Sequence, residues 1–209
     1  TFLAKWHHDY AGSSSHIHQS LRRADGETVF FDPAQPHSMS KMMQSYLAGL
    51  LTYADDTTYF LAPYVNSYKR FKAGTFAPTK AIWSIDNRTA GYRVVAENSQ
   101  NIRVECRVGG SDLNPYLALA SQLAAGLKGI EDNLTLEAEF TGDAYQADAA
   151  RSIPASLRDA TVALDQSKML RAAMGDAVVD HYVRAARWEQ EDFDGKVTDY
   201  EVRRGFERA

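Results

Sequence analysis

The side chains of this chain that could do chemistry are arginines, one glutamate and two histidines. The residues from 102 to 108 alternate apolar with charged side chains: Ile102, Arg103, Val104, Glu105, Cys106, Arg107 and Val108. Successive side chains of a β-strand point to opposite faces, so a strand here would place all three charged groups on one face. A carboxylate flanked by two guanidinium groups is expected to stay ionised, because opposite charges favour its charged form.

Two interpretations of this charged face are open. In the first, it is the solvated outer face of an antiparallel sheet. In the second, it is an anion and metal site, where Glu105 holds a cation and arginines bind phosphate and carboxylate groups through paired hydrogen bonds. Five arginines occur between positions 66 and 107, and the rest of the chain has to decide between the two interpretations.

His16 and His18 are separated by a single residue in a segment that is predicted to be a strand. Alternation would place both imidazoles, with Ser20, on one face and Ile17 on the other. Pairs of this kind are common on protein surfaces, so the two histidines alone do not define a site. With a carboxylate such as Glu105 opposite them, imidazole and carboxylate together would make a site for a divalent metal ion.

Several elements are needed to bring these side chains together. The segments Thr1–His8 and His16–Leu21 are predicted to be strands, joined by a loop of small residues from Ala11 to Ser15. Small residues in such a loop allow backbone amides to approach a ligand closely. The charged strand near Glu105 would follow later in the same sheet.

Helices are predicted from apolar residues at helical spacing and from their capping residues. The first helix is expected to begin after Ser38 as its N-cap. A second helix covers residues 116–130, with Asn114 as N-cap and Pro115 as the first residue. Its alanine and leucine content predicts that it is buried. Three more helices are expected at 156–164, 176–188 and 198–207.

Composition limits the class of protein. The chain has 209 residues, of which 44% are hydrophobic and 24% charged, as in ordinary globular domains. Its formal net charge of −4 argues against a nucleic-acid-binding surface. The single cysteine, Cys106, suits a reducing cytoplasm and is expected to be a core residue. No apolar run is long enough to cross a bilayer, so a cytoplasmic protein without a membrane partner is expected.

An ordered set of motifs resembles the catalytic domain of the glutamine synthetase family. The motifs are Gly12-Ser13-Ser14-Ser15-His16-Ile17-His18-Gln19-Ser20-Leu21, Asn66-Ser67-Tyr68-Lys69-Arg70-Phe71, Ala77-Pro78, Asn87-Arg88-Thr89, Arg103-x-Glu105-x-Arg107 and Asn114-Pro115-Tyr116-Leu117-Ala118. The resemblance extends from about Phe2 to the C-terminus. The segments around Phe76 and Asp86 look more like the γ-glutamylpolyamine synthetase and glutamine synthetase-like branch than the ammonia-assimilating enzyme.

The resemblance implies an ATP-dependent ligase of two steps. ATP phosphorylates the γ-carboxylate of glutamate, and an amine or ammonia then displaces phosphate from the γ-glutamyl phosphate. Such a site must hold several negative groups together, which calls for guanidinium groups and for Mg²⁺ or Mn²⁺.

The resemblance also implies a role for each candidate residue. His16 and Glu105 would bind the metal ion, and His18, Ser20 and Arg88 would contact the nucleotide. Gly12, Arg70 and Arg107 would contact glutamate. Arg88 and Arg93 would be catalytic, because they face the phosphates of ATP and of the intermediate.

Two departures from the family pattern affect the expected activity. Phe76 occupies a position where ammonia-using members have a glutamate, and phenylalanine can exclude water but cannot accept a proton. We therefore expect an organic amine as the nucleophile. The family's Glu-x-Glu strand, a further pair of metal-binding glutamates and its small N-terminal β-domain would all precede Thr1. The chain is thus expected to be the C-terminal portion of the catalytic domain, with little activity alone.

The expected fold is α+β: a curved, mostly antiparallel sheet with helices on its outer face, as an incomplete version of the family's catalytic barrel. The parent enzymes are ring-shaped homo-oligomers. One alternative function is a non-catalytic glutamine synthetase-like domain with an assembly or ligand-sensing role. Another is a metal-dependent hydrolase built on His16 and His18, although a hydrolase would not require the arginines.

Overall fold

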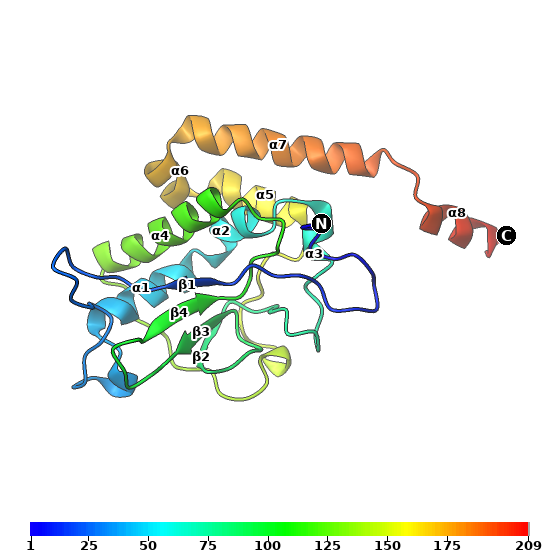
Figure 1. Cartoon of the computed structure of the whole chain (residues 1–209). Helices are drawn as coiled ribbons and strands as arrows, with labels where there is room; N and C mark the ends of the chain where they lie inside the picture. The colour runs from blue at the N-terminus through cyan, green and yellow to red at the C-terminus, as the bar shows by residue number, and fades with distance from the viewer. Residues whose placement is uncertain (209) are drawn as a thin grey trace.

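The alternating segment around Glu105 forms an inner strand of a four-stranded sheet (Figure 1). A computed structural model describes residues 1–208, and its strand order is β1-β4-β3-β2. The strands are β1 (Ile17–Gln19), β2 (Trp83–Ile85), β3 (Tyr92–Val95) and β4 (Arg103–Cys106). β4 runs antiparallel to β1 and to β3, while β2 and β3 are parallel. The predicted α+β class with a mostly antiparallel sheet is confirmed, and the open sheet is consistent with an incomplete barrel.

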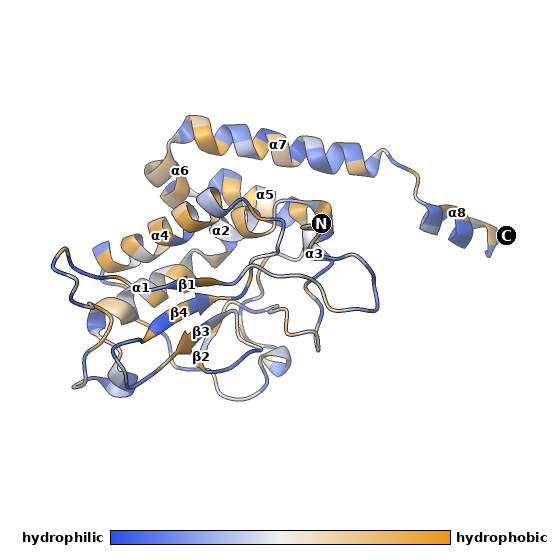
Figure 2. Cartoon of the chain, in the orientation of Figure 1, coloured by the Kyte–Doolittle hydropathy of each residue, from blue (hydrophilic) through white to orange (hydrophobic). Residues whose placement is uncertain are grey.

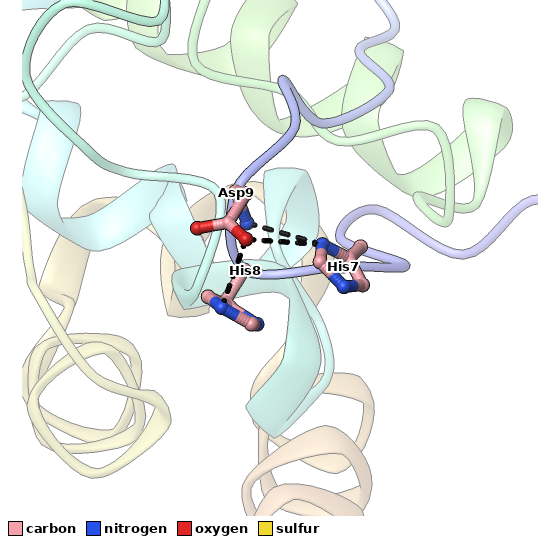
Figure 3. Close-up of side chains that lie close together, drawn as sticks. All are labelled: His7, His8 and Asp9. Atoms are coloured by element: carbon pink, nitrogen blue, oxygen red, sulfur yellow. Dashed lines mark hydrogen bonds and ion pairs between the residues drawn. The ribbon is translucent and has the colours of Figure 1, made fainter.

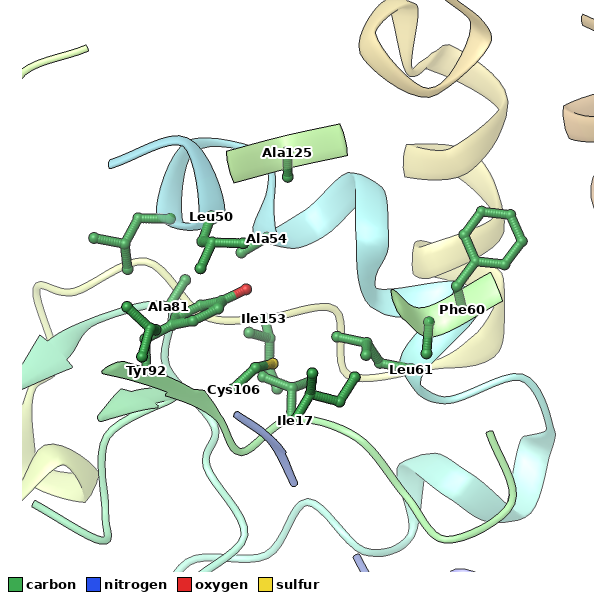
Figure 4. Close-up of a cluster of buried hydrophobic side chains, with 14 of the residues drawn as sticks. Ile17, Leu50, Ala54, Phe60, Leu61, Ala81, Tyr92, Cys106, Ala125 and Ile153 are labelled. Carbon is green, nitrogen blue, oxygen red and sulfur yellow. The ribbon is translucent and has the colours of Figure 1, made fainter. Parts of the chain in front are cut away.

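The apolar side chains of the sheet face the helices. Val104 and Cys106 are fully buried, as the alternation predicts, and they join one core with Tyr92 of β3 and Ile17 of β1 (Figure 4). Helix α1 (Lys41–Thr52) contributes Leu50 to the same core. Burial of this apolar surface is the main force that holds the helices on this face and leaves the charged face of β4 on the other side.

Helix α1 begins two residues later than the sequence predicts. The hydroxyl of Ser40 accepts a hydrogen bond from the backbone N–H of Met43 at 3.1 Å, so Ser40 is the N-cap. The prediction of Ser38 is wrong, because Ser38 is the last residue of a short 3₁₀ turn (Pro36–Ser38) and has a φ of 54°. Both serines precede the apolar run, and the local turn decides which of them caps it.

Helix α4 (Pro115–Glu131) packs along α1 and is capped as predicted. The side-chain oxygen of Asn114 accepts a hydrogen bond from the N–H of Tyr116 at 3.0 Å. The prediction that this helix is buried is correct for one face only, because the neighbouring helices leave the other face uncovered. Its uncovered face is formed by Tyr116, Leu119, Leu123 and Leu127, which are exposed.

The first eight residues form no strand, contrary to the prediction. They follow an irregular path in which Lys5 pairs with the side chain of Asn66 instead of with a neighbouring strand. The N–H of Lys5 donates to Asn66 Oδ1 at 2.9 Å, and Asn66 Nδ2 donates to the carbonyl of Lys5 at 2.8 Å. This side-chain pairing satisfies the backbone groups that a sheet would otherwise use.

The remaining helices lie on the same side of the sheet as α1 and α4 (Figure 1). They are α2 (Ala54–Leu61), α3 (Val65–Tyr68), α5 (Leu157–Gln166), α6 (Lys168–Met174), α7 (Asp176–Asp194) and α8 (Asp199–Phe206), and a further 3₁₀ turn spans Ala144–Gln146. Helix α8 extends beyond α7 and contains no buried residue, although apolar and polar residues alternate along it (Figure 2). Within residues 1–208, no helix combines the length and the apolar composition that a bilayer crossing requires.

Candidate active site

Strand register places three candidate residues in one row across the sheet. Glu105 on β4 is the direct partner of His18 on β1 and of Arg93 on β3. Direct partners in antiparallel strands project their side chains on the same face, with Cβ atoms about 5 Å apart. The row therefore brings an imidazole, a carboxylate and a guanidinium group together on the face opposite the hydrophobic core.

Glu105 is the centre of this group of charges. Its Oε1 lies 3.0 Å from His16 Nδ1 and 3.6 Å from His18 Nε2. Its Oε2 accepts hydrogen bonds from the NH1 groups of Arg93 and Arg107, each at 3.2 Å. Two histidines and two arginines from three segments of the chain thus surround one carboxylate.

Two of the three charged side chains on this face of β4 are buried and Arg103 is half-buried, so the first interpretation, a solvated outer face, is wrong for Glu105 and Arg107. Only 3% of Glu105 and 4% of Arg107 is exposed. Burial alone would raise the pKa of the Glu105 carboxyl, but the charge and hydrogen bond of Arg107, with His16 and Arg93, outweigh burial and lower this pKa. The carboxylate stays ionised, as the sequence predicts.

The two guanidinium groups beside Glu105 are not the pair that flanks it in sequence. Arg107 is one of them, but Arg103 donates from Nε to His18 Nδ1 at 3.2 Å. Arg93 takes the second position and also pairs through NH2 with Asp86 Oδ1 at 2.9 Å. The role of Asp86 as a counter-charge was missed, because only the parallel pairing of β2 with β3 brings these two residues together.

His16 has the properties of a metal ligand. Burial lowers the pKa of its imidazole, and the positive charge of Arg107 lowers this pKa further, against the opposing effect of Glu105. A low pKa keeps the ring neutral, which is the form that binds metal ions. His16 and Glu105 therefore suit a divalent cation in donor type, but they supply only two protein ligands of the set that such an ion needs.

Arg70 and Gly12 lie next to each other behind this group. Arg70 is 3% exposed, and its NH2 group donates to the carbonyl oxygens of Val108 and Gly109, the latter at 3.1 Å. A Cβ atom on Gly12 would lie 2.7 Å from Arg70 Cγ. Burial, the largest effect, lowers the pKa of Arg70 to about 10. The close approach of Gly12 explains why a glycine stands at this position.

The other candidates lie at the edge of the site. Arg88 and Ser20 are exposed, and the carbonyl of Arg88 accepts a hydrogen bond from Arg107 Nε at 3.2 Å. The carbonyl of Phe76 lies 3.4 Å from Arg107 NH2 and accepts a further hydrogen bond, while the Phe76 ring is 60% exposed. The segments around residues 76 and 88 are therefore both fixed to the Arg107 guanidinium group.

Comparison with known proteins gives a consistent result along the whole chain. A family model described as the glutamine synthetase catalytic domain matches residues 1–205. The γ-glutamylethanolamide synthetase of Streptomyces coelicolor is 46% identical over 208 residues, which is 100% of this chain and 44% of that protein. The glutamate–isopropylamine ligase of a Pseudomonas species is 35% identical, over 98% of this chain and 45% of its own length.

A solved structure of a GmaS/ADP complex has a TM-score of 0.89 and 29% identity to this chain, and the match covers 99% of this chain and 49% of the other. The chain spans about half the length of the curated relatives it matches. The family model and both relatives cover the segments that contain His16, Arg70, Glu105 and Arg107. The chain belongs to the glutamine synthetase catalytic-domain family.

Proposed function

We propose that this chain is the C-terminal part of an ATP-dependent ligase that joins the γ-carboxylate of glutamate to an amine through γ-glutamyl phosphate. The observation that supports this most directly is the charged group in which the buried Glu105 and Arg107 meet the more accessible side chains of His16 and Arg93. A domain with only a structural role has little reason to bury a carboxylate and a guanidinium group with further charged side chains beside them, because burying charges is costly.

Glutamate recognition is proposed for Gly12, Arg70 and Arg107. Arginine presents paired N–H donors that match a carboxylate, and Arg107 lies at the centre of the site. Gly12 packs directly against Arg70, where the Cβ of any larger residue would collide. These three residues could therefore bind the carboxylate groups of the amino acid and fix the reacting γ-carboxylate.

Nucleotide contact is proposed for His18, Ser20 and Arg88. All three are exposed: His18 lies beside Glu105, the carbonyl of Arg88 contacts Arg107, and Ser20 directly follows β1. Arg88 and Arg93 would stabilise the negative charge that develops as the γ-phosphoryl group is transferred. Asp86 holds Arg93 in position through their 2.9 Å ion pair.

Mg²⁺ or Mn²⁺ is the proposed cofactor, with His16 and Glu105 as ligands. A bound divalent ion supplies charge neutralisation for the phosphate groups. His18 Nε2 lies 3.6 Å from Glu105 Oε1, but within residues 1–208 no third His, Cys, Asp or Glu has a ligand atom within 4.8 Å of both His16 and Glu105 in one group. We therefore propose that the 209-residue chain alone has little ligase activity.

An organic amine is proposed as the nucleophile in preference to ammonia. The residue at position 76 is an exposed phenylalanine beside Arg107, and its ring cannot take a proton from an ammonium ion. The relative from Streptomyces is named for a γ-glutamylethanolamide product and the relative from Pseudomonas for the ligation of isopropylamine, which supports the same conclusion.

The proposal is tested by assaying the complete gene product that carries this sequence. ADP release is measured with glutamate, Mg²⁺-ATP and ethanolamine, isopropylamine or ammonium chloride in turn. We expect turnover with an organic amine and a loss of at least 100-fold, about 2.7 kcal/mol, on Arg93→Gln. The exposed Arg204→Gln on α8 is the matched control. Turnover that is unaffected by Arg93→Gln would contradict the proposed role.

A non-catalytic domain with an assembly or ligand-sensing role is the second candidate. The incomplete set of metal ligands favours it. Calorimetry of the complete gene product with ATP and Mg²⁺ separates the two functions. Binding that is lost in Arg88→Ala supports the ligase, and indifference to nucleotide together with absence of turnover supports the non-catalytic domain.

A further inference from the structure

The loop from Trp6 to Tyr10 carries a second cluster of possible metal ligands, remote in sequence from Glu105. His8 Nε2 lies 3.1 Å from Asp9 Oδ2, and His7 Nδ1 lies 3.9 Å from the same oxygen (Figure 3). One ligand atom from each of the three residues can be chosen so that all lie within 4.8 Å of one another. Among residues 1–208, this is the only group of three or more such side chains that meets that distance.

The two histidines are neighbours in sequence, yet they lie on the same side of the chain. In a strand they would point to opposite faces. The backbone instead bends between residues 8 and 10, and the imidazole rings stack with their centroids 4.5 Å apart. The bend is therefore what makes a shared site possible.

The loop is fixed at both ends. At its start, Lys5 exchanges two hydrogen bonds with the side chain of Asn66, and Lys5 Nζ donates to the carbonyl of Tyr10. At its base, the N–H of Ser13 donates to the carbonyl of Ala4 at 2.9 Å. The rings of Trp6 and Tyr10 stack at 5.2 Å across the loop. Because these contacts hold the backbone of the loop, ion binding costs little backbone entropy.

The donor atoms decide which ion fits. His7 Nδ1 accepts a long hydrogen bond from the N–H of Asp9 at 3.3 Å, so this nitrogen is unprotonated, and a metal ion bound there would replace that hydrogen bond. Two imidazoles and one carboxylate suit Zn²⁺, Ni²⁺, Co²⁺ or Cu²⁺ better than Mg²⁺ or Ca²⁺, which prefer oxygen ligands. His8 and Asp9 are exposed, so water or an anion can fill the remaining coordination positions.

We propose that His7, His8 and Asp9 bind one divalent transition-metal ion, of the Zn²⁺ and Ni²⁺ class, at a site separate from the His16–Glu105 pair. The hollow beside the two imidazoles is also lined by Lys5, Lys69 and Lys72. These positive charges oppose a bare cation and favour an anionic ligand, such as a carboxylate, in the open coordination position.

The test is a titration of the 209-residue chain with Co²⁺, followed by its visible absorption, and with Zn²⁺, followed by calorimetry. We expect one ion per chain that excess Mg²⁺ does not displace. His8→Ala and Asp9→Asn should each weaken Zn²⁺ binding at least tenfold, about 1.4 kcal/mol. The matched control is His181→Ala, which removes an exposed histidine from α7. Lys72→Ala should tighten binding, because it removes a positive charge from the hollow.

Three results would overturn this proposal. They are no Zn²⁺ binding at millimolar concentration, equal binding by wild type and His8→Ala, and loss of binding in His16→Ala but not in His8→Ala. The last result would locate the ion at the His16–Glu105 pair. His7, His8 and Asp9 are not part of the hydrophobic core, so the variants are expected to fold. Circular dichroism of each variant checks that a loss of binding is not caused by a loss of folding.

Discussion

Arg93 and Glu105 are direct cross-strand partners, and Arg93 NH1 lies 3.2 Å from Glu105 Oε2. Arg107 reaches the same oxygen at 3.2 Å from the other side. The side chains of Glu105 and Arg107 are 4% and 5% exposed. Both arginines therefore depend on one buried carboxylate for their counter-charge, and Arg93 has Asp86 as an additional partner.

Glu105→Gln should destabilise the fold as well as the site. The amide keeps a hydrogen-bond acceptor but leaves two guanidinium groups beside it without their shared counter-charge. Removing one partner of a buried ion pair costs about 3–5 kcal/mol, and we expect the lower end of that range in the free energy of unfolding. Urea denaturation followed by circular dichroism measures the change.

The control for Glu105→Gln is Glu27→Gln. Glu27 pairs with Arg23 at 2.8 Å, but both side chains are more than half exposed. Exposed pairs contribute about 0–1 kcal/mol. Equal effects of the two substitutions would show that Glu105 is not the buried counter-charge of Arg93 and Arg107.

Gly12→Ala should displace Arg70. The added Cβ would lie 2.4 Å from the carbonyl oxygen of Ala4 and 2.7 Å from Arg70 Cγ, so the backbone or the arginine must move. Overpacking of this kind costs about 1–3 kcal/mol of unfolding free energy. Thermal unfolding measures the loss, and Gly205→Ala is the control because nothing lies within 4 Å of its added Cβ. A Gly12→Ala chain as stable as the control would contradict the close approach.

The sequence was sufficient to predict β4 and α4. In β4, the alternation over residues 102–108 determines which side chains share a face, and the fully buried Val104 and Cys106 follow it. In α4, Asn114 is the N-cap and Pro115 is the first helical residue, as predicted, and both act through the backbone of the first turn alone. Such elements are specified by neighbouring residues and need no tertiary information.

The contents of the site depend on tertiary contacts that the sequence does not reveal. Arg103 and Arg107 are equally close to Glu105 in sequence, but Arg103 is drawn to His18 by the pairing of β1 with β4. Arg93 replaces it because β3 pairs with β4 in a register that only the folded sheet defines. The burial of Glu105 could not be predicted either, because a solvated sheet face has the same alternating pattern.

The stability of the fold should decrease at alkaline pH. Burial raises the pKa of the Tyr46 and Tyr59 hydroxyls above the unfolded value of about 10. Burial likewise raises the pKa of the Cys106 thiol to about 12. At a pH above the unfolded pKa of each group, the folded state keeps a proton that the unfolded state has lost. The unfolding free energy therefore falls by about 1.4 kcal/mol per pH unit for each group.

Arg70 acts in the opposite direction. Its folded pKa of about 10 lies below the unfolded value, so above pH 10 the unfolded state holds the extra proton and stability rises. The groups with a raised pKa, Tyr46, Tyr59 and Cys106, outnumber Arg70, so a net decrease in the free energy of unfolding is expected. Denaturation in urea from pH 8 to 11 measures the slope, which Tyr46→Phe should reduce and the exposed Tyr200→Phe should leave unchanged. A slope unaffected by Tyr46→Phe would contradict the assignment.

Phe76→Glu should shift the proposed ligase from organic amines toward ammonia. The backbone carbonyl of Phe76 accepts a hydrogen bond from Arg107 NH2, so residue 76 lies next to an arginine proposed to bind glutamate. A positioned general base contributes about 10²–10⁴ in rate, and we expect at least the lower end for ammonium. The measured quantity is the ratio of kcat/KM for ammonium to kcat/KM for ethanolamine in the complete gene product.

Phe76→Leu separates the effect of the carboxylate from that of losing the aromatic ring. Position 76 has a φ of 55°, which strains any residue except glycine, so both substitutions keep the same backbone strain. If the side chain at position 76 selects the nucleophile by proton transfer, only glutamate raises the ratio. An equal ratio in both variants would mean that residue 76 only excludes water, and the choice of amine would then have to be made by residues other than Phe76.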